Sequence, residues 1–223
     1  MKKIVTITVA AALVAGCNPF NRARPKTPVV GERVAVLTNE ADIVVDEATA
    51  AAPFSLPAAE ANAAWNQPGG NASKSLGHLA LGNALGTAYS IQAGSGTRVD
   101  ARLASSPVVE NGRVFTIDTT ATVRAFDAQT GAQVWAVQFG TEKGNNASLF
   151  GGGVSVENGR VYATNGLGFV AALDASNGAI LWQVRPGGPL RGAPTIAGDT
   201  LYVMSQDNQI FSLKTADGTT NWT

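Results

Sequence analysis

One short pattern occurs three times in this chain of 223 residues and limits its folds more than any other feature. Each copy has an apolar residue, a turn that ends in glycine, and a tryptophan four residues after that glycine. Successive copies are 47 and 40 residues apart, and their pairs are Gly131 with Trp135, Gly178 with Trp182, and Gly218 with Trp222. A period of about 40 residues predicts a repeat architecture.

Short β-rich runs fill each period. In the first copy they cover residues 107–109, 113–117, 122–126 and 133–137, with Asn111-Gly112 and Thr130-Gly131 as turns between them. Asn-Gly supplies the positive φ values of a tight hairpin, and no helical stripe appears. Four antiparallel strands in each repeat predict an all-β fold, a β-propeller of four-stranded blades.

The expected organisation has a leader, a tether and a partial propeller. We assign residues 1–16 to a lipoprotein signal peptide, 17–64 to a lipidated cysteine, a tether and an N-terminal strand segment, and 65–223 to the propeller, with repeats at about 98–140, 145–186 and 188–223. Propellers typically have about four to eight blades. Three copies therefore predict a propeller that is incomplete in this chain, which we interpret as an N-terminal fragment or truncated product.

The N-terminus has the form of an export signal. Met1-Lys2-Lys3 precedes an apolar run over 4–14 that is too short to span a bilayer as a helix. Small residues then lead to Cys17, the single cysteine, in a sequence that resembles a bacterial lipobox. We expect Cys17 to be acylated by more than one chain, which gives stable anchoring.

Short strands are expected at 33–37, a candidate to close the propeller, and at 41–47.

The repeats resemble the pyrroloquinoline-quinone-type propeller repeat, whose motif is Asp-x-x-Thr-Gly-x-x-x-Trp. Residues 127–135 match it, while Asn177 and Lys214 depart from it in the later copies. We expect the motif's glycines and tryptophans, Gly131, Trp135, Gly178, Trp182, Gly218 and Trp222, to be structural: the glycines for their positive φ and the tryptophans as apolar plugs between blades.

Together with the lipobox and the segments at 31–33, 65–71 and 77–82, the repeats make the chain similar to the BamB family of outer-membrane protein assembly factors. The resemblance implies a scaffold lipoprotein of the β-barrel assembly machinery that binds the periplasmic domains of the assembly barrel. It also implies an anchor on the periplasmic face of the outer membrane, a location favoured by Asn18 after the cysteine, and nascent outer-membrane proteins as further partners.

Residue types argue against catalysis. His78 and Cys17 are each the only residue of their kind, so no histidine-based triad, Cys-His pair or histidine metal cluster can form. Gly166-Leu167-Gly168 imitates a dinucleotide fingerprint, but the required helix cannot follow because Asn177-Gly178 interrupts the segment. We expect no enzyme activity, catalytic residue, metal or cofactor.

The alternative function is that of a fragment of a periplasmic quinoprotein dehydrogenase, dependent on pyrroloquinoline quinone. These enzymes contain repeats that resemble those of this chain. They hold the quinone above a Ca²⁺ ion, usually beside a disulfide between adjacent cysteines, and a chain with one cysteine cannot form that disulfide. Asp118, Asp174 and Asp207 do not converge in any way that the sequence shows, and turn formation explains the first two. Further repeats could carry the Ca²⁺ site, so this alternative stays open.

Charge excludes one class of partner. Lysine plus arginine and aspartate plus glutamate number 16 each, so the formal net charge is zero. With no basic face and no interleaving of aromatic and basic residues, we expect no nucleic-acid binding.

A residue that the blade requires should recur in each repeat, whereas a partner-binding residue need not. The 47- and 40-residue steps align Leu190 with Leu103 and Phe150, but they align Arg191 with Ala104 and Gly151. The loop 189–192 also resembles the one by which the family docks the assembly barrel. We therefore take Leu190, which we also expect to pack, and Arg191 as partner-binding candidates, and Arg113 as a control for charge alone.

Overall fold

The computed structural model describes residues 31, 44–102, 105–142 and 151–223. The expected leader, Cys17 and the candidate closing strand at 33–37 lie outside these residues. The chain divides into two compact units, residues 1–54 and 55–223. Within the described residues, no helix has both the length and the apolar character needed to cross a membrane.

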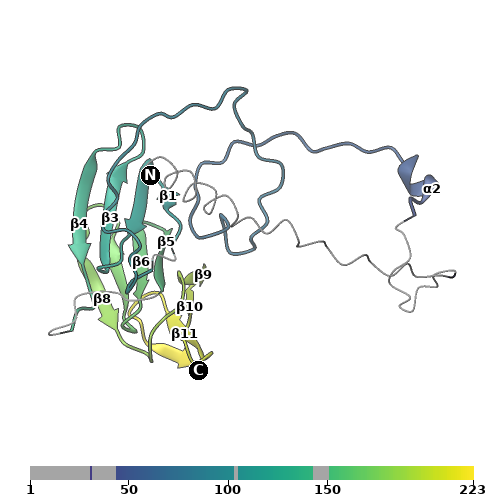
Figure 1. Cartoon of the computed structure of the whole chain (residues 1–223). Coiled ribbons are helices and arrows are strands. Elements are labelled where there is room, and N and C mark those ends of the chain that lie inside the picture. The colour runs from purple at the N-terminus through teal and green to yellow at the C-terminus, as the bar shows by residue number, and fades with distance from the viewer. Residues whose placement is uncertain (1–30, 32–43, 103–104, 143–150) are drawn as a thin grey trace, which may run out of the picture. The chain divides into compact units, whose positions relative to one another are not determined.

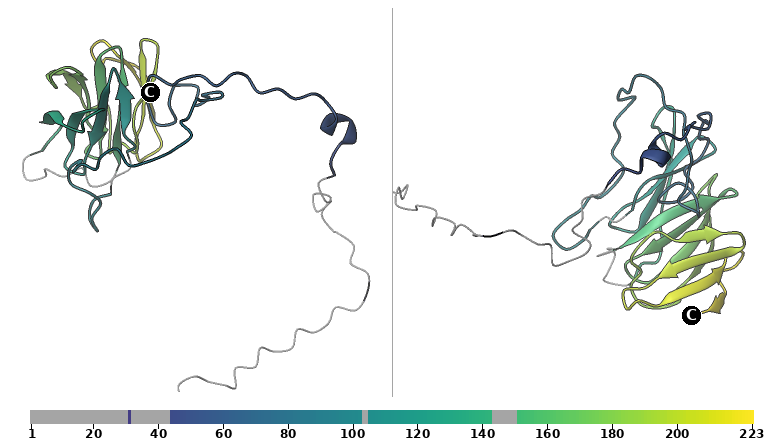
Figure 2. Two further views of the ribbon diagram at one scale, coloured as in Figure 1. Left: turned by 90° about the horizontal axis from the view of Figure 1, so that it is seen from above. Right: turned by 90° about the vertical axis from the view of Figure 1, so that its right-hand side faces the viewer.

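The second unit contains three four-stranded antiparallel sheets, which confirms the predicted β-propeller architecture (Figure 1). Strands within each sheet follow one another in chain order, and the third sheet, yellow in Figure 2, carries the C-terminus. Because about four to eight blades typically close a ring, these three described blades form an incomplete propeller. The strands are β1 (Val108–Glu110), β2 (Arg113–Ile117), β3 (Thr122–Asp127) and β4 (Gln133–Gln138) in blade 1, β5 (Gly152–Glu157), β6 (Arg160–Asn165), β7 (Val170–Asp174) and β8 (Ile180–Val184) in blade 2, and β9 (Thr195–Ala197), β10 (Thr200–Met204), β11 (Ile210–Lys214) and β12 (Thr220–Trp222) in blade 3.

The strand expected at 41–47 is wrong over its described part, residues 44–47. The helix α2 (Glu47–Ala50) begins there instead. The Asp46 side chain accepts hydrogen bonds from the backbone N–H groups of Ala48 at 2.9 Å and Thr49 at 3.3 Å, as an N-cap does. A local cap, with alanines that favour helix, therefore outweighs the short apolar run that suggested a strand.

Strand registers give the blades two distinct ends. One end, called here the connector face, carries the turns Asp118–Ala121, Asn165–Phe169 and Ser205–Gln209 together with residues 185–194, which join blade 2 to blade 3. The opposite end, called the motif face, carries the hairpins between the first and second strands of each blade. It also carries the glycine-containing motif turns between the third and fourth strands. A residue in a loop of a blade can therefore be placed on one of these two faces.

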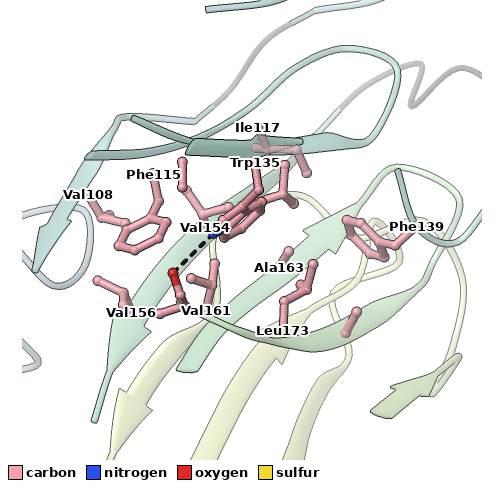
Figure 3. Close-up of a cluster of buried hydrophobic side chains, with 14 of the residues drawn as sticks. Val108, Phe115, Ile117, Trp135, Phe139, Val154, Val156, Val161, Ala163 and Leu173 are labelled. Atoms are coloured by element: carbon pink, nitrogen blue, oxygen red, sulfur yellow. Dashed lines mark hydrogen bonds between the residues drawn. The ribbon is translucent and has the colours of Figure 1, made fainter. Parts of the chain in front are cut away.

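A tryptophan from blade 1 and one from blade 2 each pack on the motif turn of the next blade. Trp135 is 8% exposed and donates its indole N–H to the Ala175 carbonyl at 3.1 Å, the dashed bond in Figure 3. A Cβ atom on Gly178, which has φ of 78°, would lie 2.8 Å from the Trp135 ring, so only glycine leaves room for this stacking. Trp182 repeats the arrangement on Gly218, with its indole N–H 3.0 Å from the Thr215 carbonyl. Trp222 is 52% exposed.

A segment before the first blade makes the same kind of contact. The Tyr89 hydroxyl donates to the Ala128 carbonyl at 2.8 Å, and Ala128 is the equivalent in blade 1 of Ala175 in blade 2. A Cβ atom on Gly131 would lie 2.8 Å from both Tyr89 and Ile91. Among the described residues, Tyr89 therefore packs on the motif turn of blade 1 as the tryptophans do on blades 2 and 3. The sequence pattern did not indicate this position.

Candidate partner-docking loop

Hydrogen bonds to its backbone hold the segment that joins β8 to β9. The Leu190 N–H donates to the Asn165 carbonyl at 3.4 Å, and the Arg191 N–H donates to the Met204 carbonyl at 3.0 Å. The Pro189 carbonyl accepts from the Gln206 N–H at 2.7 Å. Blades 2 and 3 both contribute partners, so this loop has a defined conformation.

Close backbone packing holds the same segment from the side of blade 2. A Cβ atom on Gly151 would lie 2.3 Å from the Leu190 carbonyl oxygen, and one on Gly168 would lie 2.6 Å from the Gly187 carbonyl oxygen. The Thr164 hydroxyl also donates to the Gly192 carbonyl at 2.6 Å. Glycines of blade 2 thus create the room in which the loop lies.

Leu190 is not available to a partner. Its side chain is 1% exposed and belongs to the apolar core between blades 2 and 3, together with Ile196, Leu201 and Phe211. Its assignment to partner binding is therefore corrected: Leu190 packs, because its side chain points under the loop into this core. It fixes the position of the residue that follows it.

Arg191 points the other way and is exposed. One guanidinium N–H donates to the Gln206 carbonyl at 3.0 Å, which orients the group, and among the described residues its other donors have no acidic partner. Beside it, Gly188, Pro189, Gln206 and Asp207 line an open hollow of the connector face. The chemistry on offer is an oriented cation beside a shallow surface depression.

Two other arginines of the connector face already have acidic partners. Arg185 pairs with Glu142 and lies 5.1 Å above the Phe169 ring, and Arg124 pairs with Asp118 at 2.7 Å. In the ranges 44–102, 105–142 and 151–223, no carboxylate forms an ion pair with Arg191. Arg191 is therefore the cation of these three that can take an acidic group from another molecule.

Three turn-capping residues at equivalent positions of the blades, called here the capping column, were not predicted as a set from the sequence. Asp118, Asn165 and Ser205 are aligned by the same 47- and 40-residue steps, and each accepts backbone N–H bonds in the turn that follows it. Asn165 also donates to the Gly140 carbonyl of the preceding connector at 3.2 Å. Comparing polar residues between repeats would have found this column. It also explains Gly166-Leu167-Gly168 as a capped turn between two strands.

Asp118 gives this capping a pH dependence. Burial acts to raise its pKa, but hydrogen bonds from Thr120, Ser95, Arg124 and Thr122 outweigh burial and hold the pKa of Asp118 below its usual value. A depressed folded pKa contributes stability above the ordinary aspartate value of about 3.9, and that stability is lost as the pH falls through the folded value.

We therefore expect Asp118→Asn to lower the free energy of unfolding at pH 7 by about 1–3 kcal/mol. We also expect the variant to show a weaker loss of stability below the ordinary aspartate pKa. Urea unfolding at a series of pH values measures both effects. Asp100→Asn, at a carboxyl that is 68% exposed, is the control. An acid-induced loss equal to that of the unmodified chain would contradict this role of Asp118.

The remaining sequence candidates do not form a reactive cluster. Asp174 caps its own turn through the Ser176 and Asn177 N–H groups, and the His78 Nδ1 lies 2.8 Å from the Pro57 carbonyl oxygen. Across the described ranges, no group of three or more histidine, cysteine, aspartate or glutamate side chains is placed to hold a metal ion.

Arg113 cannot serve as a control for charge alone. Its guanidinium donates to the Ala175 and Ser176 carbonyls of blade 2 at 2.7 and 2.8 Å, so it is part of an interface between blades. Lys214 is the better control, because it is exposed and lies at the motif-face end of β11. A change of charge there leaves the loop at Arg191 untouched.

Comparison with known proteins identifies relatives of the whole propeller region. The family profile described as outer membrane protein assembly factor BamB matches residues 61–145 and 119–223, and the profile of the prokaryotic membrane lipoprotein lipid attachment site matches residues 1–18. No curated protein matches the chain.

Solved structures share the architecture at low sequence identity. A europium-containing methanol dehydrogenase is 17% identical with a TM-score of 0.59, covering 72% of this chain and 31% of its own, and this similarity shows the fold alone. BamB from Moraxella catarrhalis is 20% identical with a TM-score of 0.43, covering 56% and 38%. A quinohemoprotein alcohol dehydrogenase from Comamonas testosteroni is 21% identical with a TM-score of 0.47, covering 55% and 21%. The chain thus spans well under half the length of these proteins.

Proposed function

Because the chain belongs to the family described as outer membrane protein assembly factor BamB, we propose that it is a scaffold lipoprotein of the outer-membrane β-barrel assembly machinery. In this role it has no catalytic residue and binds the periplasmic domains of the assembly barrel. Nascent outer-membrane proteins are additional partners. The anchor is Cys17, within the lipoprotein attachment site at 1–18, and the location is the periplasmic face of the outer membrane.

The display of Arg191 is the observation that carries this proposal. The backbone on both sides of Arg191 is fixed by hydrogen bonds from two blades, while within the described part of the chain the guanidinium makes one hydrogen bond, to the Gln206 carbonyl. A group that is already ordered loses less conformational entropy on binding than a flexible one. A rigid loop with one oriented cation therefore supports docking to an acidic group of a partner.

The arrangement of charges supports a specific docking site rather than general attraction. The formal net charge is zero, so long-range steering of an acidic partner is weak. On the connector face, Arg185 and Arg124 are occupied by Glu142 and Asp118. Affinity would then depend on the contact at Arg191 and the hollow beside it more than on the total charge.

Arg191→Glu tests this proposal. We expect binding to the purified periplasmic domains of the assembly barrel from the same bacterium to weaken by about 30-fold or more, the change for loss of a central arginine worth at least 2 kcal/mol. The melting temperature should stay unchanged, because the side chain is exposed. Titration calorimetry and a thermal melt measure the two quantities on the full chain.

Lys214→Glu is the matched control, since it makes the same change of charge at an exposed residue of the same blade, at its other end. It should change the dissociation constant by less than about twofold, as expected for a charge outside the contact. If Arg191→Glu binds as tightly as Lys214→Glu does, Arg191 is a solvated loop residue and docking must occur elsewhere.

A further inference from the structure

Three consecutive residues, Trp65, Asn66 and Gln67, cross the innermost strands of three consecutive blades. They contact Val109 of β1, Val156 of β5 and Ile196 of β9, respectively. These three strand residues are equivalent positions, since they are separated by the same 47- and 40-residue steps as the tryptophans. The segment thus meets the same site once in each blade.

At each site the segment satisfies both backbone groups of the strand residue. Trp65 does so with its own backbone, which exchanges two 2.8 Å hydrogen bonds with Val109. Asn66 accepts from the Val156 N–H through its carbonyl at 2.8 Å and donates from its side-chain amide to the Val156 carbonyl at 3.0 Å.

Gln67 makes the third pair with its side chain alone. Its amide oxygen accepts from the Ile196 N–H at 3.0 Å, and its amide nitrogen donates to the Ile196 carbonyl at 2.9 Å. A carboxamide carries one donor group and one acceptor, which is the complement of a strand residue's free edge. Gln67 is 2% exposed, so these bonds are shielded from water.

The rest of the segment folds back and holds this arrangement in place. The Gly70 N–H donates to the Gln67 carbonyl at 2.7 Å, and the Asn66 N–H donates to the Gly70 carbonyl at 2.9 Å. Glu110 fixes the middle residue, because its carboxylate accepts from the Asn66 amide at 3.0 Å and also from the Asn158 and Gly159 N–H groups of blade 2.

We propose that residues 65–70 are a built-in peptide ligand of the propeller, a plug that occupies the inner strand edges of blades 1 to 3. Free strand edges bind extended chains through the backbone. The plug takes this binding capacity away from other peptides, so no extended partner can pair with these inner edges. Partners are then directed to the outer surfaces of the blades, including the connector face.

These hydrogen bonds also define which sequence the inner strand edges of blades 1 to 3 can bind. A residue with an extended backbone must be followed by two carboxamides of different length, because Asn66 uses one backbone and one side-chain group while Gln67 uses two side-chain groups. This inference rests on contacts within the chain and is independent of the proposed partner at Arg191.

Hydrogen exchange of individual amides in the full chain tests the plug. In the unmodified chain the amides of Val109, Val156 and Ile196 should be protected, although all three lie on the strand edges that face away from the other strands of their blades. Gln67→Met keeps the length and apolar stem of the side chain but removes both hydrogen bonds. It should raise the exchange rate of the Ile196 amide about tenfold or more by local opening.

Gln209→Met is the control, an exposed glutamine of blade 3, and it should leave the Ile196 amide unchanged. Fast exchange of the three amides in the unmodified chain would overturn the proposal, and this measurement needs no variant to fold. An Ile196 exchange rate that Gln67→Met leaves unchanged would overturn it as well.

Discussion

Replacing Trp135 by alanine is expected to lower the free energy of unfolding by about 3–5 kcal/mol, the usual cost of deleting a buried large aromatic side chain. The indole is 8% exposed, lies in the core shared by blades 1 and 2, and donates to the Ala175 carbonyl. Its loss leaves a cavity against Gly178 and a buried carbonyl with one donor fewer. Urea unfolding followed by circular dichroism measures the change.

The other repeats provide graded controls for this variant. Trp182 makes the same contact but is less buried, so Trp182→Ala should cost less than Trp135→Ala. Trp222 is 52% exposed, and Trp222→Ala should change the stability by less than about 1 kcal/mol. Equal effects at all three positions would contradict the view that burial against the next blade, and not the motif itself, determines the cost.

Leu190→Ala is expected to destabilise the fold by about 2–5 kcal/mol, because a fully buried leucine leaves a cavity that the surrounding strands fill only in part. Leu190 is part of the core between blades 2 and 3, and it is next to the residue that we assign to docking. The variant should therefore weaken both the fold and partner binding, whereas Arg191→Glu should weaken binding alone.

Thermal melts and titrations on the same preparations separate these two outcomes. Leu181→Ala is the matched control, because this leucine is 47% exposed on β8 and should change the stability by no more than about 0.5 kcal/mol. A Leu190→Ala protein with unchanged melting temperature would mean that the loop does not depend on the blade core for its position.

The sequence predicted the blades well for a physical reason. Strand length, turn type and side-chain alternation are local properties, so the Asn111-Gly112 turn and the glycines before Trp135 and Trp182 could be read directly. The prediction failed at 44–47, where a strand was expected from a short apolar run. There the N-cap at Asp46 and the alanines after it decided in favour of α2.

The candidate site was predicted only in part. Repeat comparison selected Arg191, which does not recur, and indicated a packing role for Leu190, which does, while the loop resemblance kept Leu190 as a partner-binding candidate. The structure decided between these two roles, because Leu190 is 1% exposed and Arg191 is exposed. The choice of Arg113 as a neutral control was wrong because its two bonds reach residues 62 and 63 positions further along the chain.

The sequence by itself determined the repeat, its four-stranded blade and the lipoprotein lipid attachment site, because each depends on residues close together in the chain. The tertiary structure alone decided what joins the units. Three contacts between distant segments are examples. Tyr89 takes the place of a tryptophan, Gln67 binds a strand edge 129 residues away, and glycines of blade 2 leave room for the loop at 187–191. Such contacts depend on how far each blade is rotated against the next, and no local pattern records that rotation.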